Sequence, residues 1–390
     1  MIRVAFMPID GKNWTGGYNY LLNLLKALAI HQKDAITPVL FVPAEDEANF
    51  KAFAALPGVD VVSSELFNAS RRRTQLLQAI LLGRAPALAR LFAQRRIDVI
   101  FESAQFFGWR LGFPAIAWIP DFQHKALPHL FSRAAWWKRE IGFRAQILGG
   151  RAILLSSDDA RHDCERHYPQ TCGRARVVRF AVPTCAVPDF PTARAIADGY
   201  GLPPNFIFMP NQFWRHKNHM LTLDALSVLR DRGIKIVVAA SGKQHDPRAP
   251  GYFHVFERRL KDRGLEASLR LLGLIPYEHI HALMRCCQAM LNPSLFEGWS
   301  TTVEEARALA TPMLLSDLEV HREQMGVDAR YFRRDSAEAL ADLLQTVPSF
   351  DGSARELALD AARRDAEDRV RGFAADFTRL ALDAAGARPA

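Results

Sequence analysis

The stretch Asn292-Pro-Ser-Leu-Phe-Glu-Gly-Trp-Ser-Thr-Thr-Val-Glu-Glu-Ala306 decides the fold. An apolar run over 289–292 leads into it, and residues 302–309 have helical spacing. A strand that passes through a Glu-Gly loop into a helix is typical of a parallel α/β sheet. The N–H groups of Trp299, Ser300, Thr301 and Thr302 are expected to be unpaired, and the positive helix end favours an anion there.

The side chains of this stretch suit a hydroxyl-rich ligand. Gly298 lets the backbone approach a ligand closely. Glu297 precedes the helix and Glu305 lies about one turn into it, so both carboxylates are placed to accept hydrogen bonds from a sugar or ribose. An ordinary helix cap with an acid in its first turn explains the same pattern, and both interpretations stay open.

A second informative stretch, Pro210-Asn-Gln-Phe-Trp-Arg-His-Lys-Asn-His219, follows the apolar run 206–209. Arg215 and Lys217 after a strand suit a diphosphate, because arginine binds phosphate oxygens bidentately and lysine acts as a point charge. The alternative is a solvated basic turn. The pair together favours a phosphate site.

Alternating strand and helix patterns extend outward from these stretches. They run over 3–156, with a helical pattern at 76–92, and again over 206–315, and five prolines between 183 and 204 are typical of a linker. The predicted fold is α/β, with two Rossmann-like domains facing across a cleft. The predicted divisions are an N-terminal acceptor-side domain (1–185), a linker (186–204), a C-terminal donor domain (205–352) and a C-terminal helix (353–390) that packs back toward the N-terminal domain.

The spacing Glu297-x7-Glu305, in Phe-Glu-Gly-Trp…Glu-Glu-Ala, resembles the E-x7-E signature of retaining family 4 glycosyltransferases (glycosyl transferases group 1), which have the GT-B fold. Arg-x-Lys-Asn at 215–218 and Leu-Gly-Leu-Ile at 272–275 are also similar to that family. The resemblance extends over the whole chain and is strongest over 205–320. It implies metal-independent transfer of a hexosyl unit, with retention, from a UDP- or GDP-linked sugar to a glycan or lipid-linked acceptor in surface polysaccharide biosynthesis.

The resemblance also implies roles for particular residues. Glu297 contacts the donor sugar, Glu305 contacts the ribose, and Arg215 and Lys217 neutralise the diphosphate. The donor-binding set is completed by backbone or side chains at Gly298, Trp299, Ser300, Thr301, Leu274 and Ile275, the last two near the base.

Several positions depart from the family pattern. Asn211 stands where an arginine is frequent, Thr311 stands where glycine is usual, and Ser241-Gly242 replaces a glycine pair. We predict that Asn211 and Gly242 still lie at the nucleotide.

In the N-terminal half, Gly16-Gly17 resembles the glycine loop after the first strand. Pro120-Asp121, with His124 nearby, replaces a His-Asp pair. Asp121 or His124 is predicted to line the acceptor side of the cleft, although a lone histidine is more often structural.

Charge and composition bound the partners. The net charge of +8 permits nucleic acid, anionic lipid and phosphorylated substrates alike. Basic and aromatic residues over 131–144, with Arg71-Arg72-Arg73, suit a peripheral membrane contact, and an ordinary solvated helix is the alternative. No apolar run approaches the ~20 residues of a membrane span, and no signal-peptide pattern is seen. We expect a cytoplasmic protein, peripheral at the inner face of the membrane.

Cysteine and acidic patterns argue against a metal. The five cysteines (Cys164, Cys172, Cys185, Cys286, Cys287) have no C-x-x-C spacing and are expected to be reduced structural thiols. No D-x-D pair stands where a metal-dependent transferase has one, and helix capping explains Asp158-Asp159. We therefore expect no cofactor and no metal.

Three other classes of protein share some of these features. A sugar-nucleotide epimerase of GT-B architecture would act without an acceptor, and the E-x7-E context argues against it. A nucleic-acid-binding protein would gather its arginines on one face, whereas here they are scattered, so we expect no nucleic-acid partner. A dehydrogenase is disfavoured because no G-x-G-x-x-G follows a strand.

Overall fold

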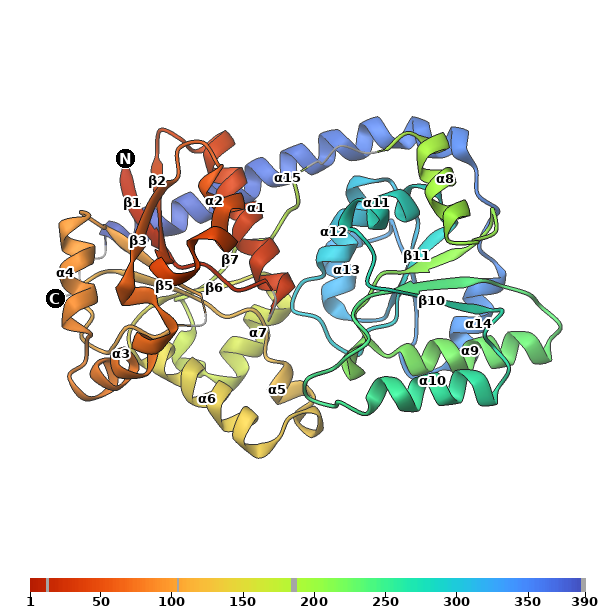
Figure 1. Ribbon diagram of the computed structural model, residues 1–390, viewed down its shortest axis with the longest axis horizontal. Helices are drawn as coiled ribbons and strands as arrows, with labels where there is room; N and C mark the ends of the chain where they lie inside the picture. Colours follow the sequence, from red (N-terminus) through yellow and green to blue (C-terminus); the bar gives the residue numbers. More distant parts are fainter. Residues whose placement is uncertain (12–13, 104, 184–187, 387–390) are drawn as a thin grey trace. The chain divides into compact units, whose positions relative to one another are not determined.

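The computed structural model describes residues 1–11, 14–103, 105–183 and 188–386 and divides into two compact units (Figure 1). Unit 1 comprises Met1–Phe122, Arg133–Pro183 and Asp368–Ala390, and unit 2 comprises Gln123–Ser132 and Thr184–Glu367. Cys185 and the start of the predicted linker, residues 186 and 187, lie outside the described residues.

Unit 1 is built on a parallel sheet of seven strands in the order β3-β2-β1-β4-β5-β6-β7. Strand order reverses between β1 and β4, which are neighbours although two strands separate them in the chain. The strands are β1 (Ile2–Phe6), β2 (Ile36–Pro43), β3 (Asp60–Ser64), β4 (Val99–Ser103), β5 (Ala115–Trp118), β6 (Ala152–Leu155) and β7 (Ala175–Val177).

Helices cover both faces of this sheet because its strands are apolar on both sides. The helices of this part of the chain are α1 (Thr15–His31), α2 (Lys51–Ala54), α3 (Ala69–Leu81), α4 (Pro86–Gln94), α6 (Arg133–Leu148) and α7 (Asp158–His167). Phe41 and Phe67 pack with Phe92 of α4 on one face. On the other face, the rings of Phe6 and Phe101 pack against Phe377 of the C-terminal helix.

The prediction of a single helix over 76–92 is wrong. The chain forms α3 and α4, which meet at an angle of 97°. Gly83 has φ +76° at the break and its carbonyl accepts a hydrogen bond of 2.7 Å from the Arg110 N–H, while Pro86 opens α4. The left-handed glycine and the proline end one helix and start the next, and apolar spacing alone does not reveal that.

Unit 2 is built on a parallel sheet of six strands in the order β10-β9-β8-β11-β12-β13. The strands are β8 (Ile207–Met209), β9 (Val238–Ser241), β10 (Leu269–Gly273), β11 (Ala289–Asn292), β12 (Met313–Ser316) and β13 (Arg330–Phe332). The helices are α5 (Gln123–Ala126), α8 (Phe190–Gly199), α9 (His219–Asp231), α10 (Tyr252–Asp262), α11 (Tyr277–Cys286), α12 (Thr301–Ala308), α13 (Glu319–Met325) and α14 (Ala337–Gln345).

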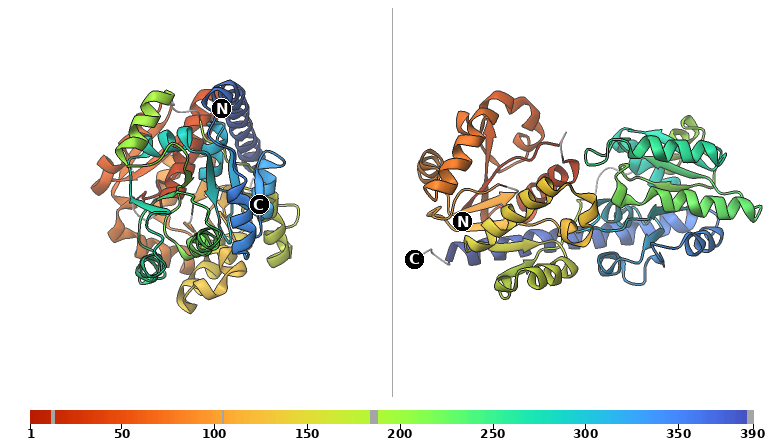
Figure 2. Two further views of the ribbon diagram at one scale, coloured as in Figure 1. Left: turned by 90° about the vertical axis from the view of Figure 1, so that its right-hand side faces the viewer. Right: turned by 90° about the horizontal axis from the view of Figure 1, so that it is seen from below.

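Alternate strand residues of unit 2 enter two hydrophobic clusters on opposite faces of the sheet. Ile207 and Met209 of β8 pack with α9, α10 and α14, whereas Phe208 packs with α8, α11 and α12 (Figures 1 and 2). This two-sided burial is the arrangement expected of a parallel sheet. Elements β13, α13 and α14 had no sequence prediction.

Helix α8 lies inside the stretch 186–204 that was predicted as a linker. The Asp189 side chain accepts a hydrogen bond of 2.8 Å from the Thr192 N–H, and Pro191 occupies the first turn, where its missing N–H costs nothing. Ala193 and Ala197 are buried in the same cluster as α11. These prolines therefore flank or open a helix.

Residues 123–132 belong with unit 2, although they stand within the predicted domain 1–185. Arg248 holds them: its Nη1 donates 2.6 Å to Gln123 Oε1, and its guanidinium lies 5.2 Å from the centroid of the Phe131 ring. Helix α15 (Gly352–Gly386) begins in unit 2, and its residues from Asp368 onward belong with unit 1.

Candidate functional site

The candidate site of unit 2 lies where the strand order of its sheet reverses. Strands β8 and β11 are neighbours, but β9 and β10 extend the sheet on one side and β12 and β13 on the other. Such a switch point leaves space at the carboxyl ends of the strands and is the usual ligand site of α/β sheets. Lys217 follows β8 and Glu297 follows β11, so the topology brings both to this edge.

Lys217 and Glu297 form an ion pair, with 2.6 Å between Lys217 Nζ and Glu297 Oε1. The Ser294 hydroxyl donates to the same carboxylate oxygen at 2.7 Å. Lys217 ends the 3-10 turn η5 (Arg215–Lys217), and Asn218 follows at φ +58°, a left-handed conformation that asparagine tolerates. The predicted phosphate-binding cation and sugar-binding acid are therefore brought into direct contact.

A buried histidine that the sequence interpretation missed supports this pair. His321 Nδ1 lies 2.9 Å from the Ser316 carbonyl oxygen, which can only accept, so Nδ1 carries the proton. The Ser316 hydroxyl donates 2.7 Å to the carbonyl of Ser294, which itself binds Glu297. Burial lowers the pKa of His321, keeping the ring neutral beside Glu297 and Lys217.

Glu305 is the second predicted acid, and it is almost completely buried at 4% exposure. Its Oε1 accepts a hydrogen bond of 2.6 Å from the Tyr277 hydroxyl. Burial raises the pKa of Glu305 to about 7, and the Tyr277 hydrogen bond lowers it only in part. A ligand hydroxyl that donates to Glu305 would favour its charged form. Tyr277 was not predicted, because nothing in the spacing connects it to Glu305.

The loop before α12 is more fully bonded than expected. The prediction that the Ser300 N–H is unpaired is wrong, because it donates 3.1 Å to Gln324 Oε1. The Ser300 hydroxyl accepts from Asn292 at 3.1 Å. Thr301 opens the helix, and Gly298 and Trp299 lie in the preceding loop, partly exposed. Gln324 comes from α13, a long-range partner invisible to a local motif.

Other predicted donor-site residues lie along the same edge. Arg215 is exposed, and its N–H donates 3.0 Å to Asp246 Oδ2. Asn211 is 3% exposed, and its side-chain nitrogen has no hydrogen-bond partner among the described residues. Gly242 has φ +144°, and a Cβ there would lie 2.5 Å from the Asn211 carbonyl oxygen, so only glycine fits.

Leu274 and Ile275, predicted near the base, follow β10. The Leu274 side chain is 80% exposed, whereas Ile275 is buried in the cluster of α8 and α11. Leu274 is therefore available for an apolar contact, while Ile275 can contribute only its backbone.

The predicted residues of the N-terminal half are distributed over both units. Gly16 and Gly17 stand in the first turn of α1, and a Cβ on Gly17 would lie 2.5 Å from the Trp14 ring. Asp121 of unit 1 forms an ion pair with Arg139. His124 belongs with unit 2 and is fully buried, with its ring near Phe131. Their roles stay predictions.

Unit 1 has a cavity of about 340 Å³ at its own switch point. Residues after β1 and β4 line it, together with the last residue of β2 and helix α3. Most of the lining is apolar, with cationic side chains at Arg72 and Lys138. Its position at the carboxyl ends of the strands makes it the counterpart in unit 1 of the Lys217–Glu297 edge.

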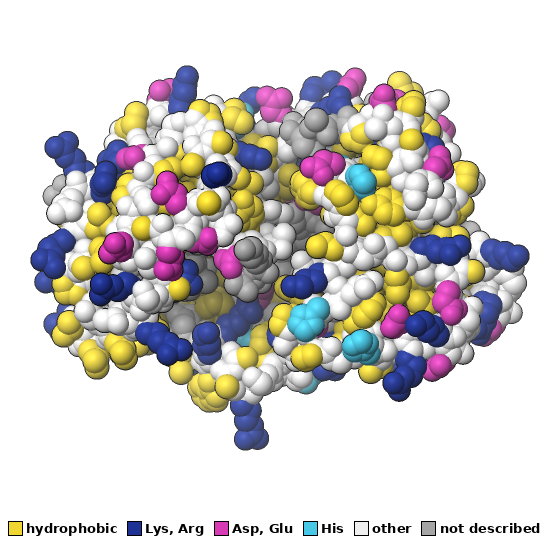
Figure 3. Space-filling view, viewed as in Figure 1, with side chains coloured by type: hydrophobic (Ala, Val, Ile, Leu, Met, Phe, Trp, Pro, Cys, Tyr) yellow, Lys and Arg dark blue, Asp and Glu magenta, His cyan; other side chains and the backbone are white. Residues whose placement is uncertain are grey.

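Some features bear on cofactors and membranes. Among the described residues, no group of three or more His, Cys, Asp and Glu side chains is placed to hold a metal ion. Within that same part of the chain no single helix has the length and apolar content to cross a membrane; α3 and α4 meet those criteria only as a bent pair. The face shown in Figure 3 carries lysines and arginines dispersed among acidic and apolar side chains.

Comparison with known proteins shows similarity to glycosyltransferases. Residues 198–361 match the family model "Glycosyl transferases group 1". "Putative glycosyltransferase EpsF" of Bacillus subtilis (strain 168) is 29% identical over 116 residues, which span 30% of this chain and only 28% of that relative's length.

Solved structures match over nearly the full length. Anabaena Alr3699/HepE, solved with UDP and glucose, has a TM-score of 0.69 at 15% identity, covering 98% of this chain and 100% of that one. A glycosyltransferase from Rickettsia africae ESF-5 has a TM-score of 0.65 at 14% identity, covering 98% and 96%. The fold is that of the two-domain GT-B proteins.

Proposed function

We propose that the protein is a retaining glycosyltransferase that moves a hexosyl unit from a nucleotide-diphosphate sugar to a lipid-linked or glycan acceptor in surface polysaccharide biosynthesis. The observation that carries the proposal is the Lys217–Glu297 pair at the switch point of unit 2, within the part of the chain that matches the glycosyl transferase family. HepE, which shares the fold, was solved with UDP-glucose, which supports a UDP-linked donor.

Each residue of the site has a role in this reaction. The bond between the anomeric carbon and the diphosphate oxygen breaks, the acceptor oxygen forms the new bond, and the acceptor proton is released. Lys217 and Arg215 stabilise the negative charge that develops on the leaving diphosphate, so no metal is required. Glu297 accepts hydrogen bonds from sugar hydroxyls, and Glu305 accepts them from the ribose.

The cavity of unit 1 suits an amphiphilic acceptor. Its apolar walls, from residues such as Leu76 and Phe106, match a lipid chain, and Arg72 and Lys138 match its phosphate. Gly16, Gly17, Asp121 and His124 remain the predicted acceptor-side residues. We therefore favour a lipid-linked phosphate over a free glycan.

Helix α3 supplies a surface for peripheral membrane contact. Ala79 is the one residue of the helix that is fully buried, while Leu77 and Leu81 are 58% and 78% exposed. Arg71, Arg72 and Arg73 lie on the same helix. Exposed leucines with adjacent arginines match an anionic lipid surface. We therefore place this helix, as part of the proposal, at the cytoplasmic face of a membrane.

The first experiment is a thermal-shift panel of UDP, GDP, ADP and their common sugars, with and without EDTA, because a ligand that binds the folded state stabilises it. We expect a shift with one nucleotide family that EDTA leaves unchanged and that the variant Glu305→Gln reduces. Product analysis with that sugar nucleotide then separates the classes, since an epimerase converts it without an acceptor. A chain that no nucleotide stabilises at millimolar concentration would contradict the donor site.

A further inference from the structure

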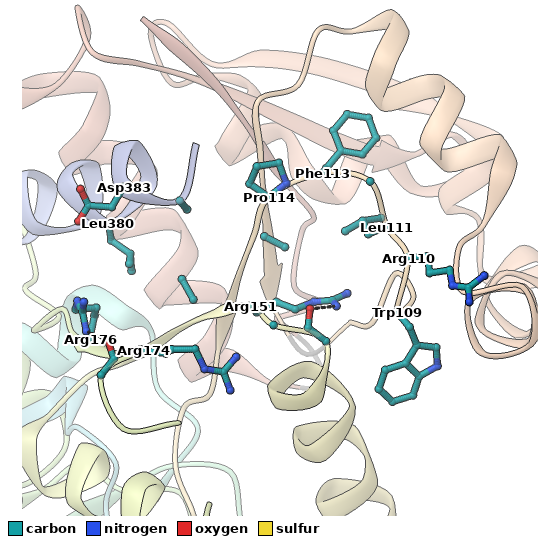
Figure 4. A pocket seen from close by; sticks show the side chains of 17 residues that line it. Trp109, Arg110, Leu111, Phe113, Pro114, Arg151, Arg174, Arg176, Leu380 and Asp383 are labelled. Atoms are coloured by element: carbon teal, nitrogen blue, oxygen red, sulfur yellow. Dashed lines mark hydrogen bonds between the residues drawn. The ribbon is translucent and has the colours of Figure 1, made fainter. Parts of the chain in front are cut away.

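A second cavity of unit 1, of about 600 Å³, lies at the opposite edge of the sheet from the carboxyl ends of the strands. Ala115, Ala152 and the turn before Ala175 line it, and they stand at the amino ends of β5, β6 and β7. Leu380 and Asp383 of α15 close another side (Figure 4). Its volume is in the usual range for small-molecule sites, and the proposed transfer reaction uses none of its residues.

The charge of this cavity is positive. Arg174 and Arg176 lie on the side where α15 passes, and Arg110 comes from the loop across from them (Figure 4). Among the described residues, Arg174 and Arg176 donate to backbone carbonyls, such as Ile147 O at 3.1 Å and Gly173 O at 2.6 Å, which leave the formal charges uncompensated. Asp383 is the one carboxylate among the lining residues.

The walls of the cavity are fixed by a buried arginine. Arg151 is 4% exposed and pairs with Glu102 at 3.0 Å. Its guanidinium also donates to Gly108 O at 2.6 Å and to Gly149 O at 2.9 Å. It thereby ties the loop after β4 to the turn before β6, so the two walls are held in place without a ligand.

The lining also offers an aromatic face. Trp109 is 42% exposed, and its ring packs edge-on against Phe106, at 4.8 Å between centroids. Gly150 and Gly173 open the rim, since a Cβ on either would meet nothing within 4 Å. An exposed indole presents a flat apolar surface and an N–H donor, and these suit a sugar ring. Two guanidinium groups without an acidic partner suit a phosphate dianion.

We propose that this cavity binds a phosphorylated saccharide, with Arg174 and Arg176 at the phosphate and Trp109 against the sugar. The site is independent of the proposed donor site and does not rest on the proposed reaction. The experiment is calorimetric titration with glucose 6-phosphate, glucose 1-phosphate and mannose 6-phosphate, performed on the double variant Lys217→Ala/Glu305→Gln so that the contribution of the donor site is reduced.

We expect at least one of these hexose phosphates to bind at a single site, more tightly than inorganic phosphate and far more tightly than glucose. The double variant Arg174→Gln/Arg176→Gln should weaken its binding by about a hundredfold, since each charged hydrogen bond accounts for roughly a tenfold change or more. The control pair Arg90→Gln/Arg95→Gln removes the same charge from exposed positions of unit 1 outside the cavity and should leave binding unchanged.

Arg174 also donates to backbone carbonyls, so its replacement removes contacts within the fold as well as charge. A variant that gains affinity separates an effect on the ligand from an effect on folding. Asp383→Asn removes the lining carboxylate and should tighten binding a few-fold, and Trp109→Ala should weaken hexose phosphates but not inorganic phosphate. Two results would overturn the proposal. One is that no hexose phosphate binds at a concentration of about 10 mM, tenfold above the Kd of about 1 mM of a weak ligand. The other is that neither Arg174→Gln/Arg176→Gln nor Asp383→Asn changes the binding affinity.

Discussion

The lysine of the candidate site is paired with a carboxylate. Lys217 Nζ lies 2.6 Å from Glu297 Oε1, and the two side chains are 16% and 9% exposed. If a diphosphate takes the ammonium, as we propose, the bond to Glu297 weakens and the carboxylate becomes available to a sugar hydroxyl. The hydrogen bond from Ser294 would keep Glu297 in place during that exchange.

Replacement of Lys217 tests the role of the ammonium. We expect Lys217→Ala to lower kcat by about 10²–10³-fold with a smaller change in donor KM, because the charge matters most when the leaving group develops its own. Lys217→Arg should restore part of kcat. Steady-state kinetics measures both, with the exposed Lys235→Ala as control, and an unchanged kcat would remove Lys217 from the reaction.

Glu305 predicts a pH dependence. Its pKa is about 7 in the folded protein against 4.5 for an unperturbed group, so the folded state binds the extra proton between these values and its stability falls as pH rises through them. Glu305→Gln lacks this dependence. Urea unfolding at pH 5 and 7.5 should show the variant gaining up to about 3 kcal/mol relative to the wild type. An equal difference at both pH values would mean that Glu305 is already charged in the fold.

Glu305 is also expected to couple nucleotide binding to the release of a proton. If nucleotide hydroxyls donate to Glu305, binding stabilises its carboxylate and releases a proton near pH 6.5. Calorimetric titration in two buffers of different ionisation enthalpy detects that release, and Glu305→Gln should abolish it while weakening nucleotide binding.

At the scale of elements, α3 is the least buried helix of unit 1. We expect Leu77→Glu/Leu81→Glu to lower binding to vesicles with 30% anionic lipid by at least about tenfold, because it replaces apolar contact with repulsion. Vesicle co-sedimentation measures this. Leu357→Glu, at a leucine of α15 that is 83% exposed, is the matched control. Equal binding of both variants would contradict the membrane contact through α3.

The sequence was sufficient to predict the fold and the site where the local residue pattern and the sheet topology agree. Apolar runs predicted the strands of unit 2 other than β13. The sequence also placed Lys217 and Glu297 after two of those strands, where the structure brings them into contact. It was insufficient where a partner comes from a distant element. Gln324 of α13 accepts a hydrogen bond from the Ser300 N–H, and Tyr277 of α11 donates one to Glu305. No local sequence pattern predicts α13 or the contact between Tyr277 and Glu305. The break at Gly83 was missed because apolar spacing continues through it.

At the scale of the whole molecule, α15 supplies core residues to unit 1. Phe373 packs against Tyr20 and Phe180, and Phe377 packs against Phe6. A chain ending at residue 367 should therefore lose the cooperative unfolding of unit 1 and bind a hydrophobic dye, since it exposes that aromatic face. Differential scanning calorimetry and dye fluorescence measure this, with removal of the last four residues as control. An unfolding profile and a dye signal that match those of the full chain would contradict it.

The position of Phe373 and Phe377 after unit 2 in the chain also has a consequence for biosynthesis. During translation the strands of unit 1 are made before unit 2, but these two side chains of its core are made after unit 2. Unit 2 has all of its segments by residue 367, so it has the means to fold before unit 1 does. We therefore expect the usual amino-to-carboxyl order of domain folding to be reversed, with a nascent chain arrested before Phe373 holding an unfinished first unit for chaperones to protect.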